Sequence, residues 1–163
     1  MTTIHAYTGD QPSHDSPHKD PYRGRAAALS MVPTSTGAAK AISLVLPHLE
    51  GRLEGSAVRV PTPNVSLVDL KIMPEKPATK EEINSAMKAA SESGPLKGIL
   101  GYAPEPLVSM DFNHDPHSST FAPAQTAVTA EGMIRVVSWY DNEWGFANRM
   151  IDTGRKLAEL SKS

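Results

Sequence analysis

The order of strand-like and helix-like patterns along this chain points to one fold class. Residues 2–7 alternate polar and apolar side chains, which predicts a strand, and residues 38–46 carry apolar side chains at helical spacing. The later patterns are strands at 58–60, 66–73, 120–121, 125–129 and 133–140, and helices starting near 80 and 147. Because strands and helices do not alternate regularly, we expect an α+β domain with a mixed, largely antiparallel sheet and helices packed on one face.

Shorter signals predict structure at single positions. Thr79 is followed three residues later by Glu82, which predicts a capping box, and Gly94 is expected to end the helix that begins there. The apolar residues at 26–31 and 107–109 are also expected to form strands.

A polar segment at 8–25 follows the first predicted strand. It contains Gly9, Pro12, Pro17 and Pro21 and shows no periodicity, so we expect a loop. A structureless segment longer than about 12–15 residues within a compact domain is usually either functional or disordered. The segment is therefore a candidate for a functional role.

Composition excludes several classes of function. From its length, the chain is expected to form a single domain, 1–163. Its net charge of −2 leaves no excess of basic residues for binding nucleic acid. The absence of cysteine excludes disulfides, cysteine zinc sites and a thiol nucleophile within this chain. The sequence has no run of about 18 apolar residues and no signal-peptide features at its start, so we expect a cytoplasmic protein without membrane partners.

The turn at residues 33–37 is the clearest candidate for a binding site. It precedes a predicted helix, and helix N-termini carry backbone donors and partial positive charge that suit a phosphate. Ordinary capping by Thr or Ser is the alternative, and pattern alone favours it. Arg23, Arg25 and Arg59 have the guanidinium geometry that binds phosphate, with surface ion pairs as the alternative.

Histidine and aromatic clusters allow two further hypotheses. Two histidine pairs with nearby aspartates could imitate a metal site, although prolines interrupt both, so a metal-dependent hydrolase is the runner-up. The side chains concerned are His14, His18, His114 and His117, with Asp15, Asp20 and Asp115. The aromatic residues at 139–146 surround Asn142, which could bind an amide, with core packing as the alternative. His5 stands alone on the first strand, where a histidine is more often a core residue than a catalyst.

Four segments together resemble a known family. They are residues 3–8 (TIHAYT), 33–40 (PTSTGAAK), 58–66 (VRVPTPNVS) and 138–145 (SWYDNEWG). In this order they resemble the C-terminal catalytic domain of glyceraldehyde-3-phosphate dehydrogenase, and the resemblance runs from residue 2 to residue 160. It implies that the N-terminal NAD-binding domain and the segment with the catalytic cysteine are absent from this chain.

The resemblance also implies roles for individual residues. His5 would be the base that activates a cysteine thiol and steadies the oxyanion. Thr36 and Gly37, with Arg23, resemble the residues that hold inorganic phosphate or the substrate phosphate. The second phosphate pocket would involve Thr8 and Arg59, and Asn142 resembles the residue that binds the nicotinamide carboxamide. Residues 8–25 resemble the family's S-loop, which lies against a neighbouring subunit's cofactor pocket in a tetramer.

Two functions follow from the resemblance. The first is the catalytic domain of an NAD(P)-dependent phosphorylating dehydrogenase of glycolysis, acting on glyceraldehyde 3-phosphate and inorganic phosphate as a homo-oligomer, and inactive as this chain alone. NAD or NADP would be the cofactor, and no metal is implied. The alternative is a non-catalytic module, derived from that enzyme, that binds phosphate or mediates oligomerisation and interaction.

Overall fold

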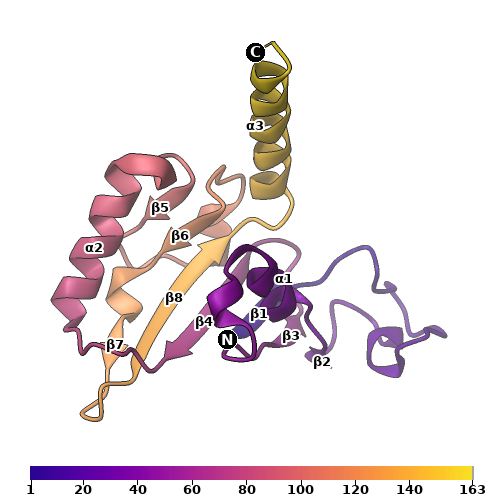
Figure 1. Ribbon diagram of the computed structural model, residues 1–163. Coiled ribbons are helices and arrows are strands. Elements are labelled where there is room, and N and C mark those ends of the chain that lie inside the picture. The colour runs from indigo at the N-terminus through magenta and orange to yellow at the C-terminus, as the bar shows by residue number, and fades with distance from the viewer. Residues whose placement is uncertain (163) are drawn as a thin grey trace.

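A mixed eight-stranded sheet forms the body of the molecule (Figure 1), and the computed structural model describes residues 1–162. The sheet order is β2-β3-β1-β4-β8-β6-β5, with β7 also paired to β8. The strands are β1 (Thr2–Ala6), β2 (Val32–Thr34), β3 (Ser56–Val60), β4 (Ser66–Ile72), β5 (Leu100–Tyr102), β6 (Ser119–Phe121), β7 (Ala127–Val128) and β8 (Ile134–Tyr140). Only the β1–β3 and β5–β6 pairs are parallel, so the predicted α+β class with a largely antiparallel sheet is confirmed.

The parallel pairing of β1 with β3 places chemically useful side chains opposite one another. Thr3 is the partner of Ala57, and His5 is the partner of Arg59. Because side chains alternate between the two faces of a strand, these four residues share one face of the sheet. The same alternation puts Ala6 on the other face, where it is fully buried.

Within residues 1–162, three α-helices accompany the sheet: α1 (Ala38–Val45), α2 (Lys80–Glu92) and α3 (Trp144–Leu160). The predicted capping box of α2 is confirmed, because the Thr79 hydroxyl accepts a hydrogen bond from the Glu82 amide (3.2 Å) and the Glu82 carboxylate accepts one from the Thr79 amide (2.8 Å). Helix α2 lies beside β5, whereas α3 projects away from the sheet (Figure 1). No helix within residues 1–162 is both long and apolar enough to cross a membrane.

Two predicted strands are wrong, for a shared physical reason. Residues 26–31 use their backbone donors on the preceding loop: the Ala26 amide binds the Asp15 carboxylate (2.8 Å), and the Ala27 amide binds the Pro12 carbonyl (2.9 Å). Residues 107–109 lead into a short 3-10 turn in which the Val108 amide binds the Asp111 carboxylate (2.8 Å). Nearby carboxylate side chains, together with a loop carbonyl, thus compete with the sheet for these amides.

The carboxylate of Asp141 joins three separate segments at the carboxyl end of β8. Its side chain is 1 % exposed, and one oxygen accepts hydrogen bonds from the Asn64 side chain and the His114 amide (both 2.8 Å). The other oxygen accepts from the amides of Glu143 (3.0 Å) and Trp144 (2.8 Å), at the start of α3. Burial alone would raise the pKa of Asp141, but these four hydrogen bonds outweigh it and hold the pKa below its ordinary value.

Candidate functional site

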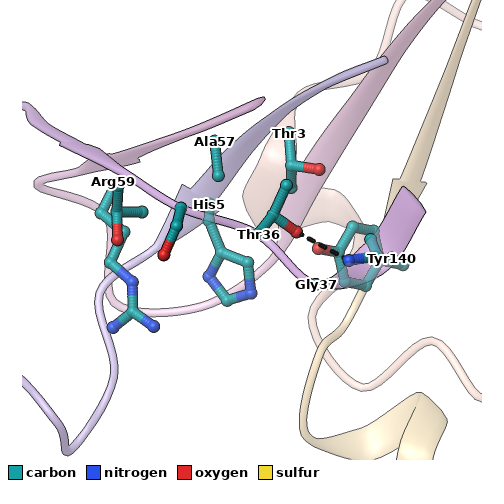
Figure 2. Close-up of a pocket in the computed structure, with 10 residues that line it drawn as sticks. Thr3, His5, Thr36, Gly37, Ala57, Arg59 and Tyr140 are labelled. Atoms are coloured by element: carbon teal, nitrogen blue, oxygen red, sulfur yellow. Dashed lines mark hydrogen bonds between the residues drawn. The ribbon is translucent and has the colours of Figure 1, made fainter. Parts of the chain in front are cut away.

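A cavity of about 330 Å³ opens between β1, β3 and the turn that leads into α1 (Figure 2). Its walls are polar on the side of the turn and carry an imidazole and a guanidinium on the side of the sheet. The lining residues are Thr3, His5, Thr34, Ser35, Thr36, Gly37, Ala38, Ala57, Arg59 and Tyr140. The structure therefore brings His5, Thr36, Gly37 and Arg59 together at one site, although they come from three separate sequence segments.

His5 lies between Arg59 and Tyr140 in this cavity (Figure 2). Its Nδ1 is 2.6 Å from the carbonyl oxygen of Ala6. A carbonyl only accepts hydrogen bonds, so Nδ1 carries the proton of the neutral ring and Nε2 keeps its lone pair. The ring of Tyr140 meets His5 edge-on, at 6.1 Å between centroids. His5 is therefore held in the tautomer that a general base requires.

Tyr140 forms a wall of the cavity and stays protonated. Burial raises the pKa of its phenol, and a hydrogen bond with Ser66 opposes this only in part. The hydroxyl is thus a neutral group at physiological pH, able to donate a hydrogen bond. The sequence indicated an aromatic cluster here but gave no signal that Tyr140 would face His5.

The turn before α1 supplies the opposite wall of the cavity. Gly37 is the N-cap residue of α1 and makes no side-chain cap, but the Thr36 hydroxyl accepts a hydrogen bond from the Ala38 amide (3.2 Å). The side-chain cap that the pattern favoured is therefore absent from the N-cap position, and Thr36 instead bonds to the first amide of α1. Ser35, Thr36, Gly37 and Ala38 all line the cavity, so the partial positive charge at the N-terminus of α1 lies beside it.

Arg59 gives the cavity a cation whose hydrogen-bond partners are neutral. Its Nη1 donates to the hydroxyl of Thr8 (2.6 Å) and to the side-chain carbonyl of Gln11 (3.1 Å). Burial lowers the pKa of Arg59, and the nearby charge of Arg23 lowers it further, but an arginine remains charged at neutral pH. No ion pair of Arg59 is found in the part of the chain that the structure describes. Its charge is therefore available to an anion.

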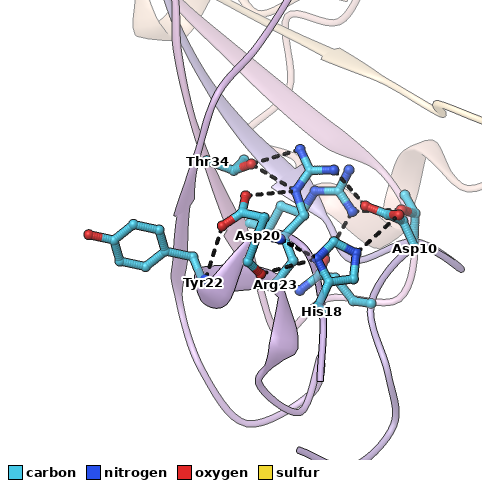
Figure 3. A network of polar contacts seen from close by, with 9 residues as sticks. Asp10, His18, Asp20, Tyr22, Arg23 and Thr34 are labelled. Atoms are coloured by element: carbon cyan, nitrogen blue, oxygen red, sulfur yellow. Dashed lines mark hydrogen bonds and ion pairs between the residues drawn. The ribbon is translucent and has the colours of Figure 1, made fainter. Parts of the chain in front are cut away.

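Arg23 lies behind the cavity wall in a network with two aspartates (Figure 3). Its Nε and Nη2 donate to the Thr34 hydroxyl (3.0 and 2.7 Å), and its Nη1 pairs with Asp10 (2.5 Å). Asp20 lies 3.6 Å from Nε. Arg23 does not line the cavity, in contrast to Arg59. Its hydrogen bonds hold Thr34 in the cavity wall, and the two aspartates largely offset its positive charge. The same network ties the 8–25 loop to β2.

Asn142 lies outside the cavity but is connected to it through Ser66. The Ser66 hydroxyl donates to the Asn142 side-chain carbonyl (3.1 Å) and accepts from the amide of Ala6, the neighbour of His5 (3.0 Å). The Asn142 amide group makes only a long contact with Glu143, at 3.4 Å. It therefore has a donor to offer a carboxamide oxygen, which fits one end of a nicotinamide.

The sequence offers no recognisable motif for the remainder of a dinucleotide. The sequence holds no Gly-x-Gly-x-x-Gly segment to receive a pyrophosphate. Asn142 is therefore the one residue of this sequence that the resemblance assigns to the cofactor, and its contact with a nicotinamide stays a prediction.

Three of the four histidines that suggested a metal site make other contacts. His18 bonds to the Asp20 amide (3.0 Å), His117 bonds to Asp115 (2.6 Å), and the ring of His114 packs on Trp144. Within residues 1–162, no three histidine, aspartate or glutamate side chains gather closely enough to hold a metal ion. The metal-dependent hydrolase hypothesis therefore has no site to support it.

Sequence reasoning missed several residues that shape the site. Thr34 and Ser35 belong to the turn that it selected, but Tyr140, Ser66 and Gln11 were not identified individually. The segment VRVPTPNVS contains Ser66, so its hydroxyl was within a recognised pattern. Gln11 carried no signal, because a glutamine in a polar loop is unremarkable until the fold buries it.

Comparisons with known proteins identify the family. A family model described as "Glyceraldehyde 3-phosphate dehydrogenase, C-terminal domain" matches residues 1–142. The glyceraldehyde-3-phosphate dehydrogenase of Cereibacter sphaeroides is 63% identical over 160 residues, which cover 98% of this chain and 48% of the relative. The corresponding protein of Xanthobacter flavus is 62% identical over 160 residues, with the same coverage. Glyceraldehyde-3-phosphate dehydrogenase 1 of Bacillus subtilis (strain 168) is 57% identical over 159 residues, covering 98% of this chain and 47% of the relative.

The chain thus spans about half the length of the curated relatives it matches. With the match of the family model and the mixed sheet described above, this settles the classification: the chain belongs to the family of glyceraldehyde 3-phosphate dehydrogenase C-terminal domains.

Proposed function

We propose that this chain provides the general base and the phosphate-binding sites of an NAD(P)-dependent phosphorylating glyceraldehyde-3-phosphate dehydrogenase, acting in glycolysis. The observation that carries the proposal is the shared cavity of His5, Arg59 and the turn at Thr36 and Gly37. A base and two kinds of anion-binding group within one cavity suit a reaction in which both substrates carry phosphate.

His5 performs the proton transfers in this proposal. Its Nε2 accepts the proton of a cysteine thiol that is not among these 163 residues, since the chain has no cysteine. The thiolate forms a C–S bond to the aldehyde carbon, and the protonated Nε2 then donates a hydrogen bond to the oxyanion. A nicotinamide held by Asn142 would supply the acceptor for the hydride that leaves this carbon as the thioester forms. An oxygen of inorganic phosphate attacks the thioester, and the C–S bond breaks to release the acyl phosphate.

The anion-binding groups orient the two phosphates. Arg59 and Thr8 form one binding position, and Thr36, Gly37 and the charge of Arg23 behind Thr34 form the other. Arginine and helix N-termini are both established phosphate-binding groups. We assign glyceraldehyde 3-phosphate and inorganic phosphate as the ligands by membership of the family.

The purified chain alone is expected to show no dehydrogenase activity. Mixed with glyceraldehyde 3-phosphate, phosphate and either NAD or NADP, it should produce reduced cofactor no faster than the protein-free mixture, because no thiol is available. The same sample should bind inorganic phosphate, observed as shifts of the amide signals of residues 34–38 in an NMR titration. Reduced cofactor formed in the absence of contaminating enzyme would contradict the need for the thiol, and unshifted amides would contradict the phosphate site.

A non-catalytic module is the second candidate, and the surface of α3 favours it. Helix α3 projects from the sheet, and Gly145 is its only buried residue (Figure 1). Its exposed apolar side chains are Trp144, Phe146, Met150, Ile151, Leu157 and Leu160. Exposed apolar patches beyond about 300–600 Å² mark interaction surfaces on proteins.

We expect the chain to self-associate through α3. Light scattering during size-exclusion chromatography should give a mass above the 17.5 kDa of one chain. The double variant Met150→Lys/Leu157→Lys should lower that mass, while Lys156→Glu on the same helix should not. A wild-type mass of one chain at high protein concentration would rule out this association.

A further inference from the structure

Gln11 is a buried polar residue beside the anion site, and neither the family resemblance nor the comparisons give it a role. Its side chain is 7 % exposed, although it belongs to the polar loop at 8–25. Its backbone amide donates a hydrogen bond to the backbone carbonyl of Thr8 (2.9 Å), so a single turn connects the two residues. Both then accept hydrogen bonds from Nη1 of Arg59.

The two arginines near the cavity are held in different ways. Arg23 is held by the carboxylates of Asp10 and Asp20, which offset its charge. Arg59 is held by a hydroxyl and an amide carbonyl, which fix its orientation without adding a negative charge. The Asp10 carboxylate does act on Arg59 electrostatically, but its oxygens bond to Arg23 and His18. A neutral acceptor at Gln11 therefore leaves Arg59 both oriented and cationic.

We propose that Gln11 is a positioning residue that orients the guanidinium of Arg59 for a phosphate group while preserving its charge. The inference rests on the phosphate binding of the proposed function. According to this inference, Gln11 contributes to phosphate binding both through its hydrogen bond to Arg59 and through its lack of charge.

The buried nitrogen of Gln11 makes this neutrality testable. Nε2 has no hydrogen-bond partner among residues 1–162. Replacing the amide with a carboxylate therefore removes no hydrogen bond and keeps the acceptor that faces Arg59. Gln11→Glu changes little except charge, and the new charge lies next to a guanidinium that must bind an anion.

The experiment compares three variants by NMR titration with inorganic phosphate and by thermal unfolding. Gln11→Glu should weaken phosphate binding by on the order of tenfold, because it neutralises Arg59, without lowering the unfolding midpoint. Gln11→Met keeps the size but removes the acceptor, and should weaken binding by about threefold. Gln125→Glu adds the same charge at an exposed position remote from β3 and should change affinity by less than about twofold.

The outcomes separate this inference from the function on which it rests. If phosphate binds the wild type and Gln11→Glu binds it equally well, the positioning role is overturned while the phosphate site stands. The positioning role would also be overturned if affinity fell only in variants whose unfolding midpoint fell as well, because a purely structural role predicts that pattern.

A second measurement applies even if the wild type binds no phosphate, in which case the proposed function fails. Carbon-detected NMR of labelled arginine reports rotation of the Arg59 guanidinium in the ligand-free protein. Two distinct Nη signals in the wild type that merge in Gln11→Met would support positioning. Identical signals in the two proteins would overturn it.

Discussion

The chain is expected to lose about 3 kcal/mol of unfolding free energy when Asp141 is replaced by asparagine. Each oxygen of Asp141 accepts two hydrogen bonds. Asparagine has one carbonyl oxygen, so in either orientation its NH2 group faces two N–H donors. The loss is large beside the 5–15 kcal/mol that typically stabilises a domain, so we expect a much lower midpoint in urea unfolding.

The matched control for this variant is Asp152→Asn on α3, which removes the same charge from an exposed carboxylate that pairs with Arg149 and Arg155. Its effect should stay below about 1 kcal/mol. Equal effects of the two substitutions would show that the Asp141 hydrogen bonds contribute little.

The stabilisation by Asp141 also carries a defined pH dependence. Because its folded pKa lies below its ordinary value, the contribution is complete above the unfolded pKa of about 3.9 and is lost as pH falls through the folded pKa. The stability gap between the wild type and Asp141→Asn should therefore narrow in urea titrations carried out below pH 4. A gap that stays constant down to acid unfolding would contradict the lowered pKa.

Replacing Arg59 with methionine should weaken binding of inorganic phosphate by on the order of a hundredfold. The substitution removes a cavity-lining cation whose partners are neutral, and it leaves Thr8 and Gln11 without their shared donor. An NMR titration with phosphate, or isothermal calorimetry, measures the change.

Arg25→Met is the control for charge, because Arg25 is exposed and paired with Asp15 outside the cavity. We expect it to change affinity by less than about twofold. If both arginine variants weakened phosphate binding to the same extent, net charge rather than the cavity would account for the binding.

Sequence patterns predicted the elements that local interactions determine. The capping box at Thr79 and Glu82 is closed by neighbouring residues, so the start of α2 could be located without knowledge of the fold. β5 was missed because three residues containing Gly101 give too short a pattern. A Cβ added to Gly101 would lie 2.3 Å from the Thr120 hydroxyl oxygen, so it is the neighbouring strand β6 that requires a glycine at this position.

The candidate site was predictable in its residues but not in its connections. The resemblance selected His5, Thr36 and Arg59, and the structure brings them together. The proton on Nδ1 of His5, however, depends on the position of the Ala6 carbonyl, and the burial of Gln11 depends on how the 8–25 loop returns to β3. The contact of Gln11 with Arg59 joins residues far apart in the chain, and the contact of His5 with its neighbour depends on how the folded chain orients the ring, so a single-sequence pattern specifies neither.

The pairing of His5 with Arg59 in the parallel ladder limits how this site can diverge during evolution. Insertions in the chain between α1 and β3 leave that ladder intact, so this segment can change length while the imidazole and guanidinium keep their spacing. Inserting or deleting one residue within either strand turns one of the two groups to the opposite face. Length variation in descendants of this domain should therefore accumulate between the strands, and the strands themselves should keep their length.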